Sequence, residues 1–443
     1  MAISADIRPF EVTHRGVLAI AVPMTFAFLS TPLLGVVNTA VIGSLGEPAL
    51  LGGIAVGAIV FDIVFTTFNF LRSGTTGFTA QAHGAGDAAE TQAMFWRGII
   101  LAAILGAAVL VLHRLILALA LGLIGGSDAV REATATYYDI RVLATPFALA
   151  NYVILGWLIG LGRPGLGLLL QTVLNGLNAV LSIIFVSHLE WGVAGVAWAA
   201  FLAELTTMAI GLPLAMALMD KARRPSRVRI LDRAAFRRLA AVNGDIMIRS
   251  FALLFAFAFF TAQSAKGGDV VLAANQILLT LFFVGSYFLD GLATAAEQMA
   301  GRAVGAHYRP AFERSLSLSI GWGFAIAAAA SAVLWFGGPW IIAAMTASEE
   351  VRAVARLYLV YAALTPLVGT LAFQMDGFFI GATWSSDMRN MMLLSLAVYV
   401  AAWWLLTPSL GIDGLWLALL VFLGIRGATL YWRCRVRMVT AFP

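Results

Sequence analysis

The residues of this 443-residue sequence that could carry chemistry are charged side chains within long apolar stretches. The second half contributes Asp245, Arg249, Asp290, Glu297 and Asp376. The first half contributes Asp62 and Glu204. An aspartate at the centre of a membrane costs roughly 2.5–3.5 kcal/mol on insertion scales, and such groups commonly mark ion or substrate pathways. The chemistry predicted for them is binding and release of a proton or another cation.

The spacing of these residues predicts that several of them meet. Asp245 and Arg249 are four residues apart, so they can pair on one helix face. Asp290 and Glu297 are seven apart and also share a face. Depth counted along the apolar stretches places Asp290, the Asp245 and Arg249 pair and Asp376 in one buried cluster. It is either a proton-sensitive switch or a static salt-bridge network, and both interpretations remain open.

A polar stripe runs along one apolar stretch of the first half. Its members occur at i, i+4, i+7 and i+11 and are Gln171, Asn175, Asn178 and Ser182. This spacing puts them on one helix face. Asn38 follows Pro32, which permits a bend in its helix. We expect Asn38 and the stripe to line one water-filled cavity, and ordinary hydrogen bonding between membrane helices is the alternative.

The composition indicates that these residues lie in membrane-spanning helices. Of all residues 61% are hydrophobic and 12% charged, and the mean hydropathy is +0.91. Apolar runs of about 20 residues are long enough to cross a bilayer as helices. We predict twelve, near 16–44, 50–71, 96–120, 141–161, 166–187, 191–219, 240–264, 270–298, 316–345, 357–382, 391–408 and 412–432. The runs are continuous rather than alternating, which favours an all-α membrane protein over a barrel.

The sequence contains an internal repeat. Residues 51–87 align without a gap on 272–308, and Gly156 and Gly160 match Gly377 and Gly381 at the same offset of 221 residues. Each half holds six predicted spans, an even number, so the two repeats enter the membrane from the same side and are parallel. The predicted organisation is an N-terminal six-helix lobe (1–220), a basic linker (221–239) and a C-terminal six-helix lobe (240–443).

Lysine and arginine residues predict the orientation. The termini and the loops on their side of the membrane carry 20 of the 28, and the opposite loops carry 6. This bias predicts cytoplasmic termini of a multi-pass protein of the cell (inner) membrane. The net charge of +5 reflects these short loops, so we expect no nucleic-acid partner. Residues 1–15 lack the short apolar core of a removable signal peptide.

Several enzyme and metal classes are disfavoured. The sequence has one cysteine (Cys434) and five scattered histidines without an H-E-x-x-H motif, so we expect no metal site and no cofactor. Asp139 and Asp87 superficially resemble the aspartates of intramembrane aspartyl proteases. The predicted topology separates them by roughly a membrane thickness, so they cannot share one proton. We therefore predict that the protein is not an enzyme.

Several blocks together resemble one family over about residues 16–433. The blocks are Val37–Gly43, Gly74–Gly77 with Ala80-Gln81, Asn243–Ser250, Leu289–Gly291 and Asp376–Thr383. They resemble the multidrug and toxic compound extrusion (MATE) transporters, and within these the DNA-damage-inducible protein F branch. The resemblance implies two six-helix lobes in a V-shaped arrangement and export of organic compounds in exchange for H⁺ or Na⁺.

The chain departs from that family at two positions. The resemblance implies aspartates where this sequence has Asn38 and Ser182, whereas Asn175 and Asn178 match the accompanying asparagines. Amide and hydroxyl groups do not exchange a proton near neutral pH. We therefore predict that cation coupling lies in the C-terminal lobe. The assigned residues are Asp245, Asp290 and Asp376, with Arg249 as the tuning charge and Glu297 as a relay.

The neutral first lobe also predicts the substrates. They should be small organic molecules that are neutral, zwitterionic or amphipathic, received by a cavity with Asn38, the polar stripe and Tyr287. We expect a monomer that works by alternating access and is surrounded by membrane lipids. Two alternatives remain open. One is a flippase for lipids or lipid-linked precursors, and the other is a degenerate membrane protein that binds a partner without transport.

Overall fold

A computed structural model of the chain describes residues 7–43, 47–124 and 127–442, and every described element is helical. This confirms the all-α prediction. The elements of the first half are α1 His14–Gly43, α2 Pro48–Phe68, α3 Phe70–Gly84, α4 Ala88–Ile124, α5 Asp128–Arg141, the 3₁₀ turn η1 Val142–Ala144, α6 Thr145–Gly160, α7 Pro164–Ile183, the π turn η2 Ile184–His188 and α8 Gly192–Leu218. Those that follow are the 3₁₀ turn η3 Lys221–Arg223, α9 Arg227–Ile230, α10 Arg233–Ala265, α11 Asp269–Gly305, α12 Arg309–Met345, α13 Glu349–Gly381, α14 Ser385–Leu410 and α15 Ile412–Ala441.

Twelve helical segments within the described ranges are long and apolar enough to cross a membrane, as predicted. The fourth, predicted at 141–161, begins 13 residues earlier than predicted. Its helical path runs from Asp128 to Gly160 through α5, η1 and α6. The first part of this path is too polar for a search based on apolar length. Tyr137 and Tyr138 nevertheless bury their rings against Phe61 of α2, so protein contacts hold this segment.

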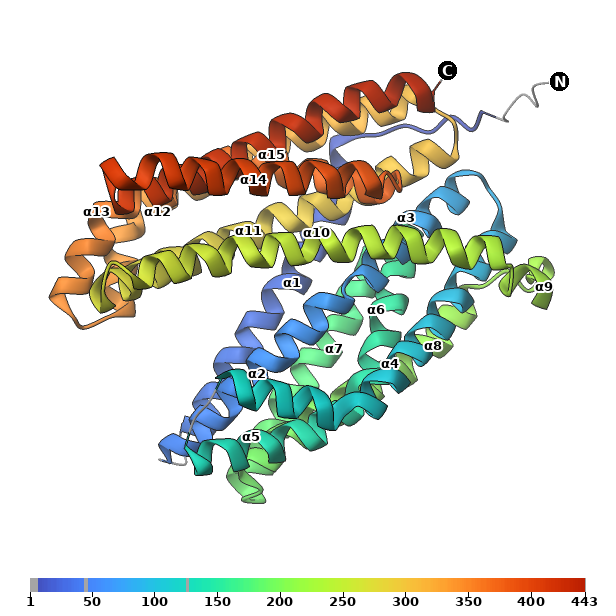
Figure 1. Ribbon diagram of the computed structural model, residues 1–443. Helices are drawn as coiled ribbons and strands as arrows, with labels where there is room; N and C mark the ends of the chain where they lie inside the picture. Colours follow the sequence, from blue (N-terminus) through green and yellow to red (C-terminus); the bar gives the residue numbers. More distant parts are fainter. Residues whose placement is uncertain (1–6, 44–46, 125–126, 443) are drawn as a thin grey trace. The chain divides into compact units, whose positions relative to one another are not determined.

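The chain divides into two compact units, whose helices are labelled in Figure 1. The N-terminal unit consists of Phe26–His83 and Asp87–Leu239. The C-terminal unit consists of Ala240–Pro443, Gly84–Gly86 and the chain up to Thr25. The linker predicted at 221–239 is thus grouped with the N-terminal unit, and α1 contributes its first turns to the C-terminal unit.

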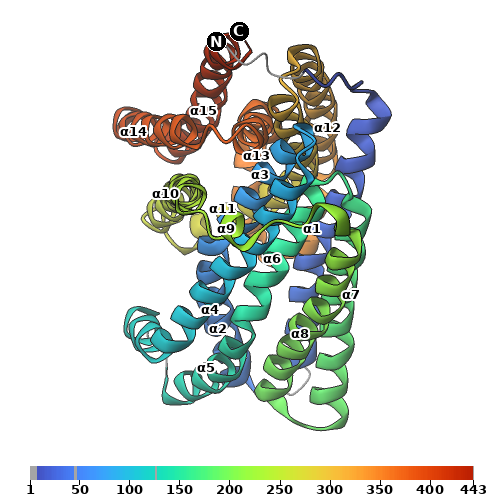
Figure 2. The ribbon, with the colours of Figure 1, turned by 90° about the vertical axis from the view of Figure 1, so that its right-hand side faces the viewer.

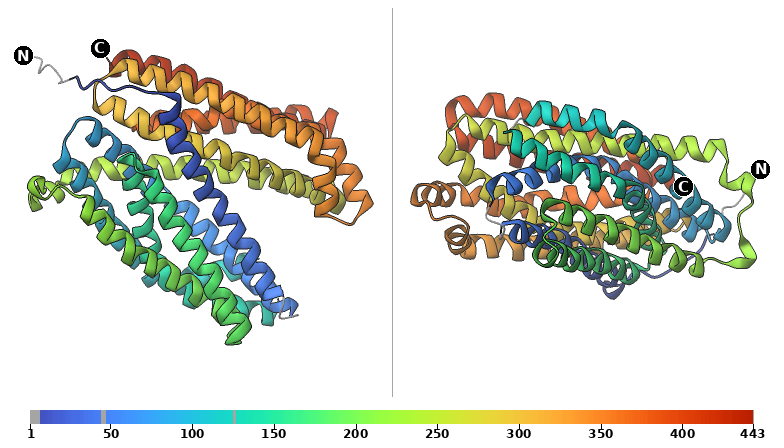
Figure 3. Two further views of the ribbon diagram at one scale, coloured as in Figure 1. Left: turned by 180° about the vertical axis from the view of Figure 1, so that it is seen from behind. Right: turned by 90° about the horizontal axis from the view of Figure 1, so that it is seen from below.

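Helix pairs build the N-terminal unit. Helices α7 and α8 run side by side, as Figures 2 and 3 show, and α2 packs against α5 and α4 against α6. The apolar core includes Phe61, Tyr138 and Val196. Proline begins α2 and α7, where its missing N–H would have no partner within the helix.

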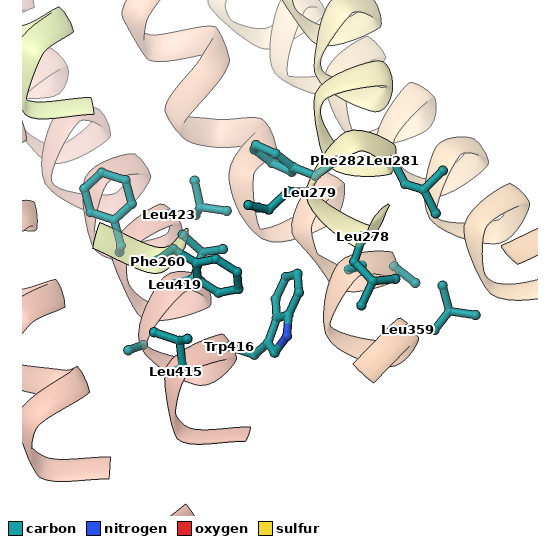
Figure 4. Packing of buried hydrophobic residues seen from close by; sticks show 14 of the residues in the cluster. Phe260, Leu278, Leu279, Leu281, Phe282, Leu359, Leu415, Trp416, Leu419 and Leu423 are labelled. Carbon is teal, nitrogen blue, oxygen red and sulfur yellow. The ribbon is translucent and has the colours of Figure 1, made fainter. Parts of the chain in front are cut away.

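The C-terminal unit is built around α11 and α13, which have the most extensive contact. Helix α15 packs on α13 and α14. The core centres on Trp416 of α15, which lies between Phe260 of α10 and Leu278 of α11 in Figure 4. The rings of Phe260 and Trp416 meet edge to face with centroids 4.7 Å apart. The indole N–H of Trp416 donates to Asn275 Oδ1 at 3.0 Å, which satisfies its polar group in an apolar core.

The glycines that mark the sequence repeat make matching contacts in the two units. Gly156 of α6 lies against the carbonyl of Arg72, and Gly377 of α13 lies against the carbonyl of Ala293. Ala293 follows Arg72 by 221 residues, the offset that also separates the two glycines. A side chain at either position would collide with backbone that has little freedom to move. The repeat therefore preserves a close approach of two helices in each unit.

Gly377→Ala is expected to destabilise the protein by about 1–3 kcal/mol, because overpacking of a close contact forces helices apart. Gly321→Ala on α12 is the matched control, since nothing lies within 4 Å of the Cβ that it would add. Thermal unfolding of both purified variants measures the difference. Equal unfolding temperatures for Gly377→Ala and wild type would show that this approach contributes nothing to stability.

The chain between the units is fixed to α4 of the N-terminal unit. The buried guanidinium of Arg97 donates from Nε to the carbonyl of Ile230 at 3.1 Å and from Nη2 to that of Arg229 at 2.6 Å. The amide of Gln92 donates to the carbonyls of Asp220 and Arg223 at 3.1 and 3.3 Å. The connection from α8 to α10 is thus a docked segment rather than a loose tether.

An ion pair adds a pH-dependent element to this docking. The Arg229 guanidinium pairs with Asp87 and, at 3.0 Å, with Glu90. Partial burial raises the pKa of Asp87, but a backbone hydrogen bond from Glu90 and the contact with Arg229 outweigh it, so the net pKa lies below its usual range. A lowered pKa in the folded state means that the contribution is present above about pH 3.9 and is lost as the pH falls through the folded value.

We expect amide hydrogen exchange in residues 220–230, corrected for its intrinsic rate, to increase as the pH falls below about 4. Asp87→Asn should raise exchange in the same residues at neutral pH, because it removes the charge that pairs with Arg229. Glu132→Gln changes an exposed acid on α5 and serves as control. Unaltered exchange in Asp87→Asn would mean that Arg97, Gln92 and Glu90 dock the segment without Asp87.

Candidate functional site

Charged side chains from four helices meet in the C-terminal unit. Asp376 of α13 is only 6% exposed, and its Oδ2 accepts hydrogen bonds from Arg249 of α10 and Arg426 of α15. Asp290 of α11 lies close enough to Arg426 for their charges to interact. These four residues, called the C-unit cluster below, combine two positive and two negative charges within membrane-spanning helices.

The cluster follows from the energetics of burial. An ion removed from water is tolerated only when opposite charge and hydrogen bonds replace its hydration. Arg426 is 1% exposed, so its charge depends on the carboxylates around it. Asp376 receives two guanidinium groups, whereas Asp290 is half-buried. The two aspartates are therefore held differently: Asp376 lies between two arginines, and Asp290 is the more exposed of the two.

The structure brings together three of the residues expected in one cluster, Arg249, Asp290 and Asp376, around Arg426. Asp245 has partners on another helix that the sequence did not predict. It accepts hydrogen bonds from Arg389 and, at 2.8 Å, from Ser385 Oγ, both on α14. The pairing with Arg249 suggested by the i, i+4 spacing stays a prediction. Spacing along one helix indicates which side chains of that helix can pair. It does not reveal partners on other helices.

Glu297 and Tyr287 lie on α11 with Asp290. Glu297 is 2% exposed and lies two turns after Asp290, where Gly381 of α13 approaches its backbone carbonyl. Tyr287 is half-buried and lies one turn before Asp290. The helix thus presents an aromatic hydroxyl, an accessible carboxylate and a buried carboxylate in succession. The roles assigned to these residues from the sequence stay predictions.

The polar stripe of α7 lies in the N-terminal unit. Asn175 donates from Nδ2 to Ser30 Oγ of α1 at 2.6 Å, and Ser182 donates to Asn178 Oδ1 at 3.1 Å. These residues are buried, whereas Gln171 and Asn38 are half-buried. The stripe therefore joins α7 to α1 through at least one hydrogen bond, in the manner of polar contacts between membrane helices. Asn38 Oδ1 is buried without a hydrogen-bond partner among the described residues.

The comparison with protein families matches the MatE family twice, over residues 23–184 and 246–404. The chain is also 39% identical to DNA damage-inducible protein F of Escherichia coli K12 over 433 residues, which cover 96% of this chain and 93% of that protein. The chain belongs to the MatE family. This confirms the resemblance noted in the sequence, and the two matches, one in each half, agree with the internal repeat.

More distant relatives also indicate a transporter. A probable multidrug resistance protein NorM of Caulobacter vibrioides is 26% identical over 442 residues, with 94% of this chain and 92% of that protein covered. A solved structure of an outward-facing multidrug resistance MATE family transporter matches with a TM-score of 0.88 at 19% identity, covering 97% of this chain and 96% of the other. MatE proteins are transporters, so this chain is a multi-pass membrane transporter and not an enzyme.

Arg426 is the member of the cluster that the sequence prediction left without a role. It lies in the last span, beyond both ranges matched by the MatE family model. An arginine within an apolar run was a usable signal, because it requires a buried carboxylate as partner. Its partner Asp376 lies 50 residues earlier on another helix, a pairing that no spacing rule reveals.

Proposed function

We propose that this MatE transporter exports small organic compounds in exchange for H⁺ or Na⁺ by alternating access. The observation that carries the proposal is the C-unit cluster, because ionisable carboxylates on membrane-spanning helices suit the binding and release of a coupling ion. Several relatives are named probable multidrug resistance protein NorM, which supports organic compounds as substrates.

Within the cluster, Asp290 is the carboxylate that exchanges the coupling ion. Asp376 is engaged by two guanidinium groups, whereas Asp290 is the more exposed of the two aspartates and its charge acts on Arg426. When Asp290 binds a proton, it loses its charge and Arg426 is left to Asp376. The balance of charge between α11 and α15 then changes, and such a change biases a helix bundle between two arrangements. Arg249 is the positive charge that tunes these carboxylates. Asp245 and Glu297 lie along the same proposed ion path.

The energy of one ion suffices for a useful gradient. One proton that crosses ~100 mV supplies roughly 2.3 kcal/mol. That free energy sustains on the order of a fifty-fold concentration ratio of a neutral solute. A single titrating aspartate therefore meets the energetic requirement, without a second coupling site.

The neutral polar groups of the N-terminal unit support a substrate preference. Asn38, Asn175, Asn178 and Ser182 offer hydrogen bonds without charge, and Gln171 extends the row. We propose neutral, zwitterionic or amphipathic substrates, received by these groups in the N-terminal unit, and Tyr287 is a further candidate contact within the C-terminal unit. We also propose a monomer in the cell (inner) membrane with both termini in the cytoplasm, since 20 of the 28 lysines and arginines lie on that side in the predicted topology.

Reconstitution in liposomes tests the function. The zwitterionic amphipathic dye rhodamine B serves as substrate, and a trapped pH-sensitive dye reports protons, in buffers with and without Na⁺. A gradient of rhodamine B is expected to drive H⁺ or Na⁺ in the opposite direction. Ion-independent movement of the dye would overturn antiport. Ion-independent translocation of fluorescent lipid head groups would favour a flippase, and absence of all movement would favour a protein that binds without transport.

A further inference from the structure

A second buried carboxylate lies in the N-terminal unit, where the polar stripe is neutral. Glu204 of α8 is 8% exposed within a membrane-spanning helix. Asn151 Nδ2 of α6 donates to its Oε2 at 2.8 Å and to its backbone carbonyl at 3.0 Å. The other carboxylate oxygen, Oε1, faces Arg141 Nη2 of α5 at 3.8 Å. Glu204 also lies outside both ranges matched by the MatE family model.

Arg141 is shared between two acids. Its guanidinium lies over the rings of Phe61 and Phe65 of α2, with centroids 5.6 and 5.2 Å away. The charge of Asp62, also on α2, acts on Arg141 as well. Aromatic faces attract a guanidinium without fixing its direction as a bidentate carboxylate contact does. Arg141 also has a side-chain hydrogen bond with Tyr137 of its own helix. Its charge acts on both Glu204 and Asp62, and its contact with Glu204 is not a bidentate one.

The contacts around Glu204 are incomplete. A separation of 3.8 Å is longer than a hydrogen bond, so Arg141 and Glu204 attract each other without one. Arg141 Nη1, Asn151 Oδ1 and Thr207 Oγ1 are buried and have no hydrogen-bond partner among the described residues. Thr207 lies one turn after Glu204 on α8. Asp376 in the C-terminal unit, by contrast, accepts from two guanidinium groups. A static structural ion pair is expected to have its hydrogen bonds complete, as Asp376 does. The polar groups around Glu204 are not all hydrogen-bonded.

We propose that Glu204 is a proton-binding site of the N-terminal unit, with Arg141 as a counter-charge that moves between Glu204 and Asp62. One proton from water adds to a carboxylate oxygen of Glu204, which becomes a neutral carboxylic acid with an O–H donor. Asn151 Oδ1 and Thr207 Oγ1 are acceptors that lack a donor in the unprotonated arrangement. Arg141 then loses the charge of Glu204 and retains that of Asp62. Release of the proton reverses these changes.

Ionisable groups from each neighbouring helix define the field of this site. Those that act on Glu204 or on its partner Arg141 are Arg141 and Tyr137 of α5, Tyr152 of α6 and Asp62 of α2. Arg72 of α3 acts on Tyr152. Helix α7 carries no ionisable side chain, and η2 carries His188 at its end. Arg141 is thus the positive charge in direct contact with Glu204.

The site would add a proton step in the N-terminal unit to the proposed antiport, and this role rests on the proposed function. Proton binding itself does not require transport, so it is tested on purified full-length protein. Infrared difference spectra between neutral and acidic pH report the carbonyl stretch of protonated carboxylic acids. Glu204→Gln keeps an acceptor for Asn151 and should lose one titrating carboxylic acid band. Glu132→Gln, at an exposed position of α5, should retain all of them.

Two further variants separate this site from the C-unit cluster. Asp290→Asn should leave the Glu204 band in place. Arg141→Gln should move the appearance of that band to higher pH, because the opposite charge that favours the ionised form is gone. A spectrum of Glu204→Gln identical to that of wild type would overturn the proposal. So would an unchanged band in Arg141→Gln. Absence of ion-coupled transport by the wild-type protein in liposomes would refute the proposed antiport. It would not affect the infrared evidence for proton binding by Glu204.

Discussion

Arg426→Met is expected to destabilise the protein by about 3–5 kcal/mol, the typical effect of removing one partner from a buried ion pair. The substitution leaves Asp376, at 6% exposure, with one of its two guanidinium partners and removes the positive charge that faces Asp290. Methionine fills much of the same volume, so the loss reports charge more than packing. Equilibrium unfolding in sodium dodecyl sulfate measures it.

Arg309→Met is the control for this experiment. Arg309 pairs with Glu313 at 2.9 Å, and their side chains are 49% and 45% exposed. An exposed pair of this kind contributes about 0–1 kcal/mol. Arg426→Lys keeps the charge but not the planar fork, so it should fall between Arg426→Met and wild type. If Arg426→Met and Arg309→Met proved equally stable, the C-unit cluster would not support the fold.

Asp290→Asn is expected to abolish proton movement driven by rhodamine B in liposomes while the protein remains folded. Asparagine has nearly the same shape as aspartate but cannot take up or release a proton near neutral pH. Asp290 is half-buried, so the change leaves the bonds of Asp376 to Arg249 and Arg426 in place. Downhill movement of the dye should persist, because loss of coupling differs from loss of binding.

Glu313→Gln, at an exposed position of the same unit, is the control and should couple as wild type does. Asp290→Glu should restore part of the proton movement, since the titrating group returns at a slightly different place. Proton movement by Asp290→Asn at the wild-type rate would remove the coupling role from the C-unit cluster. Glu204, a buried carboxylate of the N-terminal unit, would then be the next residue to test.

The sequence predicted the number of spans and the repeat because both depend on patterns along the chain. Apolar run length sets the spans, and Gly156 and Gly377 are separated by the offset that also separates their backbone contacts. The start of the fourth span was missed, because Tyr137 and Tyr138 are held by packing on α2 rather than by apolar composition. Apolar composition identifies segments that face lipid. It does not identify polar segments of a span that are covered by other helices.

The candidate site was only partly predictable for a related reason. Arg249, Asp290 and Asp376 were recognised because a charge in an apolar run is itself a signal. Their arrangement around Arg426 depends on which helices are neighbours, and α13 and α15 become neighbours only in the folded unit. Arg389, a partner of Asp245 on α14, was missed for the same reason. Side-chain direction between helices is not encoded in spacing along one helix.

The pH dependence of rhodamine B binding to the purified protein tests most directly whether a carboxylate of the C-terminal unit couples ion and substrate. The structure-based account predicts that wild type binds the dye more weakly as the pH is lowered and Asp290 takes up its proton, and that Asp290→Asn binds it with a much flatter profile. The same pH profile in wild type and Asp290→Asn would contradict it.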